Sequence, residues 1–210
     1  VEAQCGVIGN VGFLGIPMLT LLLGPGAIGP VLLVLSVDLI VFGSLIVILI
    51  CVSQGTGGAL RSALGGLIRN PMIVSITLGL AWSATSWSIP APVDEFLSIL
   101  GAAATPGALF AIGASLAFKS AERLEVAGWL SFAKLVLHPV AVAVAALLIF
   151  PVAPFAAGVM IAAAALPVAG NVYILAQHYG VAPQRVSASI LLSTVASVVT
   201  LSLVIAWVTI

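Results

Sequence analysis

Charge is what this sequence has least of. Only 6% of its 210 residues are charged, whereas soluble domains carry about a quarter. Hydrophobic residues make up 62% of the chain, and the mean hydropathy is +1.35. Such a chain cannot cover a water-facing surface, so the composition predicts an integral membrane protein in a lipid bilayer. The net charge is zero, and without a basic stretch we expect no nucleic-acid partner.

Metal ligands and catalytic groups are also scarce. The sequence has two cysteines and two histidines, and none of them has the spacing of a zinc site. Cys5 and Cys51 fall in apolar stretches, which is typical of buried small side chains. An intramembrane enzyme would need paired acids or a nucleophile with a base, and neither is present. We therefore expect no enzymatic activity and no cofactor other than a coupling ion, a proton or sodium.

Long apolar stretches fill most of the chain. A membrane-spanning helix needs about 20 apolar residues, and seven stretches approach or exceed this length. The sequence therefore predicts an all-α membrane protein with spans at about 3–23, 29–52, 71–88, 94–118, 127–150, 156–178 and 184–208.

The basic residues indicate how the spans are oriented. The five loop or loop-edge cations all fall on one side of the expected bilayer: Arg61, Arg69, Lys119, Arg123 and Arg185. The loops of the other side hold no lysine or arginine. By the positive-inside rule, loops 53–70, 119–126 and 179–184 are expected to be cytoplasmic and the C-terminus outside, in the inner (plasma) membrane.

Two of the seven spans combine asparagine, glycine and proline inside an apolar stretch. The first contains GNVGFLGIP at 9–17, and we expect its break near Gly15 and Pro17. The sixth contains LPVAGNVY at 166–173, with its break at Pro167 and Gly170. Irregular backbone at this depth is tolerated only where protein or a polar cavity surrounds it. Two interrupted spans in matching positions indicate a transporter site near the bilayer midplane.

The two interrupted spans also predict an internal repeat. They lie five spans apart and run in opposite directions, as inverted repeats of five helices do. Residues 24–49 can be aligned with 180–205 without a gap. We expect 1–52 to end a first repeat, 53–70 to form a cytoplasmic linker and 71–210 to be a complete second repeat. The first three helices of the first repeat would be absent, and without them we expect no transport.

A substrate site is expected where the half-helices begin. Their free N–H groups and positive dipole ends suit a carboxylate, and Asn10 and Asn171 would add amide donors. The alternative is that both asparagines only cap the freed backbone. The expected site comprises Asn10, Gly15, Pro17, Pro167, Gly170, Asn171 and Tyr173.

Three titratable residues inside spans are candidates for coupling. Asp38 is the one acid deep in a span, where a charge is costly and usually functional. Lys134 and His138 are four residues apart and share a helix face. Each has a structural alternative: a hydrogen-bonded Asp38 that ties two helices, a Lys134 that snorkels to the cytoplasmic side or pairs with Asp38, and an interhelical His138.

The same motifs resemble a known family. Segment 9–17, Arg69-Asn70-Pro71, and Ala165-Leu166-Pro167 with 171–180 resemble the auxin efflux carrier family, which includes plant auxin exporters and bacterial permeases, some for malonate or malate. The resemblance covers the whole chain, as the last seven of the family's ten helices. It implies a fold like bile-acid sodium symporters and sodium/proton antiporters, with the two broken helices crossing as an X.

The resemblance also implies roles for the spans. The first, second, fifth, sixth and seventh would form a transport domain, and the third and fourth a scaffold that often forms a homodimer. The substrates would be mostly organic anions bound at the crossover. Asn10 matches the crossover asparagine of the plant members, and Pro167 matches the proline of the second motif. The plant exporters have no asparagine at the position of Asn171, so the substrate stays open.

The sequence therefore predicts a secondary active transporter that moves an organic anion, such as a mono- or dicarboxylate, by alternating access. One alternative is a sodium-coupled symporter of the bile-acid type. Another is a passive channel, although a channel would need a continuous polar stripe and the chain has few polar residues to form one.

Overall fold

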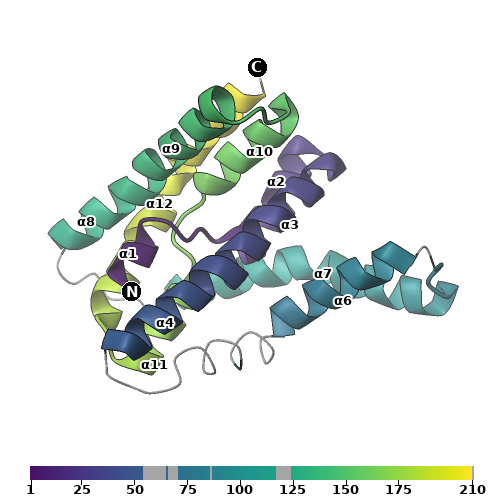
Figure 1. The fold of residues 1–210 in the computed structure, drawn as a ribbon, viewed down its shortest axis with the longest axis horizontal. Helices are drawn as coiled ribbons and strands as arrows, with labels where there is room; N and C mark the ends of the chain where they lie inside the picture. The colour runs from purple at the N-terminus through teal and green to yellow at the C-terminus, as the bar shows by residue number, and fades with distance from the viewer. Residues whose placement is uncertain (54–64, 66–70, 86, 117–123, 210) are drawn as a thin grey trace. The chain divides into compact units, whose positions relative to one another are not determined.

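A computed structural model describes residues 1–53, 65, 71–85, 87–116 and 124–209 (Figure 1). Its α-helices are α1 (Glu2–Cys5), α2 (Ile16–Leu23), α3 (Ile28–Ser36), α4 (Gly43–Ser53), α6 (Pro71–Thr85), α7 (Ala91–Leu116), α8 (Leu124–Phe132), α9 (His138–Val144), α10 (Pro154–Ala164), α11 (Gly170–Tyr179) and α12 (Pro183–Val208). A 3-10 turn, η2 (Pro25–Ala27), precedes α3. The π-helical segments are η1 (Val11–Gly15), η3 (Val37–Phe42), η4 (Ala133–Leu137) and η5 (Ala145–Ile149).

Several of these elements join into helices that are long enough to cross a bilayer. The segments Pro25–Ile50, Leu124–Ile149 and Pro183–Val208 each have 26 residues, and by length and composition they can span a membrane. Val11–Leu23 and Pro154–Ala164 are shorter apolar helices. The mostly helical fold and these apolar helices agree with the expected all-α membrane protein.

The chain divides into two compact units. The first contains Val1–Val34 and Thr105–Ile210, and the second contains Leu35–Ala104. In the first unit α12 packs against α8, α10 and α11, and α10 also packs against α9. Figure 1 shows the continuous helix from α8 to α9 running beside α12. In the second unit, the ring of Trp82, near the end of α6, meets the ring of Trp87 edge to face, with the ring centroids 5.9 Å apart.

Small side chains form much of the interior of the first unit. The buried residues of α12 include four serines, and those of α10 are mostly alanines. In membranes such residues let helices approach closely and form hydrogen bonds between helices. Ser131 of α8 donates a hydrogen bond to the carbonyl of Ser189 on α12, at 3.4 Å. Small residues on α10 and α12 therefore contribute much of the close helix packing in this unit.

Two prolines directly follow π-helical turns without breaking their helices. Pro17 is the second residue of α2 and follows η1, while Pro139 is the second residue of α9 and follows η4. At the end of these π-helical turns the N–H of Ile16 bonds to Val11, and the N–H of His138 bonds to the carbonyl five residues before it. A widened turn accommodates a proline that lacks a donor and crowds the preceding turn.

The first break is therefore not where the sequence placed it. The expected interruption near Gly15 and Pro17 is wrong, because the helix continues through both residues. The chain leaves the helix earlier, between Cys5 and Val11. The second break agrees with the prediction, since α10 ends at Ala164 and α11 begins at Gly170.

Candidate functional site: the meeting of the two breaks

The two breaks meet through their backbones. Gly9 and Val168 form an isolated antiparallel bridge, the one strand-like pairing among the described residues. The N–H of Asn10 donates to the carbonyl of Pro167 at 2.8 Å, and the N–H of Ala169 donates to the carbonyl of Ile8 at 3.2 Å. Buried backbone groups need partners, so each break supplies partners that the other lost when its helix ended.

Glycines allow this close approach. A Cβ atom added to Gly15 would lie 2.7 Å from Cδ1 of Leu166, which is closer than real Cβ contacts. A Cβ added to Gly9 would lie 3.3 Å both from the carbonyl oxygen of Ala163 and from Nζ of Lys134. The first broken segment can therefore pack closely against the second because glycine has no side chain at these two positions.

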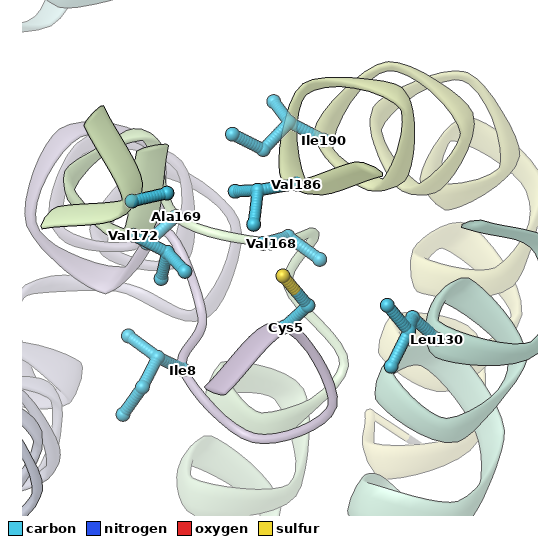
Figure 2. Packing of buried hydrophobic residues seen from close by; sticks show 9 residues of the cluster. Cys5, Ile8, Leu130, Val168, Ala169, Val172, Val186 and Ile190 are labelled. Atoms are coloured by element: carbon cyan, nitrogen blue, oxygen red, sulfur yellow. The ribbon is translucent and has the colours of Figure 1, made fainter. Parts of the chain in front are cut away.

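An apolar cluster surrounds one part of this meeting point (Figure 2). Its buried members are Cys5, Ile8, Leu130, Val168, Ala169, Val172, Ala176, Val186 and Ile190. Residues from both breaks thus pack together with residues from α8 and α12. Cys5 lies inside the cluster, in agreement with the expected buried side chain, whereas the side chain of Cys51 lies outside the part that the structure describes.

Lys134 lies at the end of the half-helix before the second break. Its side chain is fully buried, and its ammonium donates a hydrogen bond to the carbonyl of Ala164, the last residue of α10. That carbonyl is one of those left without a helical partner, at the negative end of the helix dipole. Nζ also lies 3.2 Å from Nδ1 of His138. The structure therefore shows Lys134 turned into the protein interior rather than extended toward the membrane surface.

Ser193 of α12 holds the other side of the second break. The N–H of Val168 donates to Oγ of Ser193 at 3.1 Å, and both residues are buried. The Ser193 hydroxyl donates to the carbonyl of Ile190 at 3.2 Å. Sequence reasoning missed this residue. Small polar residues recur along α12, but their spacing does not tell which one meets a break.

The two candidate asparagines lie beside the breaks. Asn10 directly precedes η1 and is 8% exposed, while Asn171 is the second residue of α11 and is exposed. Asn10 makes no side-chain cap, and no side-chain hydrogen bond of either asparagine is found within the described residues.

The other candidates differ in their positions. Pro167 is buried in the bridge, and Gly170 is exposed with nothing within 4 Å of where a Cβ would lie. Tyr173 is half-buried and packs against the apolar cluster. Asp38 is half-buried in η3 of the second unit. Among the described residues, no group of three or more His, Cys, Asp or Glu residues is placed to hold a metal ion.

Comparison with known proteins identifies the family. Residues 56–205 match the family described as "Membrane transport protein". The chain belongs to this family. It is also 33% identical, over 206 residues, to a protein of Rhizobium meliloti (strain 1021) described as a "Putative malonate transporter". The match covers 96% of this chain and 64% of that relative, so the chain spans just under two thirds of the relative's length. Together these matches confirm the resemblance to auxin efflux carriers.

Proposed function

We propose that the chain is the larger part of a secondary active transporter that moves a small organic anion across the membrane by alternating access. The expected substrate is a mono- or dicarboxylate, and malonate is the first to test because the relative from Rhizobium meliloti carries that name. The observation that carries the proposal is the bridge between Gly9 and Val168, because the buried side chain of Asn10 lies beside it, where two interrupted helices meet.

The chemistry at this point favours an anion. The first N–H groups of α11 have no partner within their helix and lie at its positive end. Gly170, at the first position, leaves open space beside them. In its protonated form Lys134 adds a positive charge, with Nζ 3.3 Å from where a Cβ on Gly9 would lie. In a medium of low dielectric constant this charge raises the affinity for an anion and lowers it for a cation.

The proposed mechanism divides the chain into a moving part and a scaffold. We place the first, second, fifth, sixth and seventh spans in the transport domain. This is supported by one compact unit that holds the first, fifth, sixth and seventh spans and the start of the second, together with the end of the fourth. The third and fourth spans would form the scaffold and a homodimer interface. The inverted repeat, the plasma-membrane location and the outward C-terminus belong to the same proposal. Asp38, Lys134 and His138 are the proposed residues for coupling transport to a proton or sodium ion.

The test measures transport currents from the full-length protein in proteoliposomes on a solid-supported membrane. Malonate, malate and indole-3-acetate are offered with and without sodium and a pH gradient. We expect a saturable carboxylate current that is lost in Asn10→Ala and in Asn171→Ala. Gln177→Ala is the matched control, because it removes an exposed amide from the same helix, α11, away from the break.

Each other outcome rejects a defined part of the proposal. If the folded protein gave no transport current with any of the anions, the anion assignment would be overturned. A current that requires sodium and ignores the pH gradient would establish the bile-acid type of symporter, and a current that does not saturate would establish a channel. Asparagine variants that lose thermal stability but keep the same half-saturating concentration would show that the amides only cap the helices.

A further inference from the structure

One backbone donor of the second break points away from the first break. Gly9 and Val168 face each other in the bridge, and the hydrogen bonds between the two segments are made by the next residues along, through the N–H groups of Asn10 and Ala169. In an antiparallel pair of this kind the two residues directly opposite, Gly9 and Val168, do not bond to each other. The N–H of Val168 therefore needs a partner from elsewhere, and it is buried where water cannot serve.

Ser193 supplies that partner from α12. Its hydroxyl oxygen accepts from Val168 at 3.1 Å while its own proton goes to the carbonyl of Ile190 at 3.2 Å. A hydroxyl has one donor and two acceptor sites, so both bonds are satisfied together. The side chain is 0% exposed. A continuous series of two hydrogen bonds thus links the second break to the backbone of α12 through Ser193.

From this chain of bonds we infer that Ser193 is a positioning residue of the substrate site, an inference that rests on the proposed function. Pro167 has no N–H to fix the segment. Of the donors that follow it, Ala169 is held by the first break, and Val168 is the one held by a side chain within the part of the chain that the structure describes. Because Val168 lies two residues before Gly170, a shift at its N–H reorients the first turn of α11, where Asn171 lies.

The neighbouring serines of α12 do not have this role. Ser197 is also buried, at 5% exposed, but its hydroxyl donates to the carbonyl of Thr194 on its own helix at 2.7 Å. Ser189 donates to Arg185 on the same helix at 2.8 Å. Ser197→Ala therefore removes a buried hydroxyl from the same helix without touching the break, and it is the matched control.

The experiment uses the full-length protein with malonate as the probe. We expect Ser193→Ala to raise the half-saturating malonate concentration about five- to tenfold, as the loss of one net hydrogen bond would, with Ser197→Ala unchanged. Ser193→Thr keeps the hydroxyl and should restore most of the affinity. In parallel, amide hydrogen exchange of the peptide that contains Val168 should be faster in Ser193→Ala, without any substrate present.

Two results would overturn the inference. One is an equal change in Ser193→Ala and Ser197→Ala. The other is a lower melting temperature in Ser193→Ala with the half-saturating concentration and the exchange of the Val168 peptide both unchanged. If Ser193→Thr does not fold, the two alanine variants decide. If the wild-type protein gave no malonate current, malonate would be rejected as the substrate. The amide hydrogen exchange of the Val168 peptide in wild type and Ser193→Ala would then test the positioning role by itself.

Discussion

The two breaks are stabilised in different ways. The first, between Cys5 and Val11, finds its cross-break partners in the backbone of the second. The second has those bonds and two side chains besides, Lys134 on the carbonyl of Ala164 and Ser193 on the N–H of Val168. The second break is thus held by side chains from η4 and α12, and the first is positioned on it through glycines that allow close contact.

Their prolines differ as well. Pro167 lies inside the second break, whereas Pro17 lies beyond the first break, within a helix whose preceding π-helical turn accommodates it. The same residue type therefore accompanies a break in one span and a continuous helix in the other. A proline shows where a helix is weakened, and the surrounding contacts decide whether the chain leaves the helix there.

The largest effect is expected from removing the charged anchor of the second break. Lys134→Met keeps an unbranched buried side chain but removes the hydrogen bond from Nζ to the carbonyl of Ala164. The loss of this buried hydrogen bond should cost about 1–3 kcal/mol, so thermal denaturation in detergent should show a clear loss of stability. The malonate current should disappear, because the positive charge and the position of α10 change together.

A neighbouring substitution provides the control for Lys134. Leu135→Met alters the adjacent buried residue of η4 with little change in volume, and such exchanges usually cost less than about 1.5 kcal/mol. It should keep the current. If Lys134→Met retained both the wild-type stability and the wild-type current, Lys134 would not stabilise the second break, and the proposed difference between the two breaks would be wrong.

Sequence reasoning found the second break and misplaced the first. Pro167, Gly170 and Asn171 fall together at the real interruption. In the first span the helix-breaking residues are spread over 9–17, and local propensity alone selected Gly15 and Pro17. The position of the first break depends instead on backbone hydrogen bonds to a segment about 160 residues away along the chain. The snorkelling alternative for Lys134 failed for the same reason, since its partner, Ala164, is 30 residues away along the chain.

The next effect in size is expected from adding one methyl group to the glycine contact of the first break. Gly15→Ala places a Cβ 2.7 Å from Leu166, which is fully buried and has little room to move. Overpacking of this kind typically costs about 1–3 kcal/mol. Gly170→Ala is the counterpart at the second break, where nothing lies within 4 Å, and its stability should be near that of the wild type.

A second variant shows whether the clash itself is the cause. Gly15→Ala combined with Leu166→Ala should cost less than the sum of the two single changes, because the shortened side chain leaves room for the new methyl group. Additive free energies, or equal effects of Gly15→Ala and Gly170→Ala, would mean that close packing at Gly15 does not hold the first break.

The smallest effect is expected at the ion pair that links α1 to α12. Nε of Arg185 lies 2.8 Å from Oε1 of Glu2, and the side chains are 34% and 35% exposed. Exposed pairs contribute about 0.2–1 kcal/mol, so a double-mutant cycle with Glu2→Gln and Arg185→Gln should give a coupling energy in this range that falls as salt is added. The current should persist in both variants. A coupling above about 2 kcal/mol, insensitive to salt, would give the first break a charged anchor comparable to Lys134. The two breaks would then be stabilised alike.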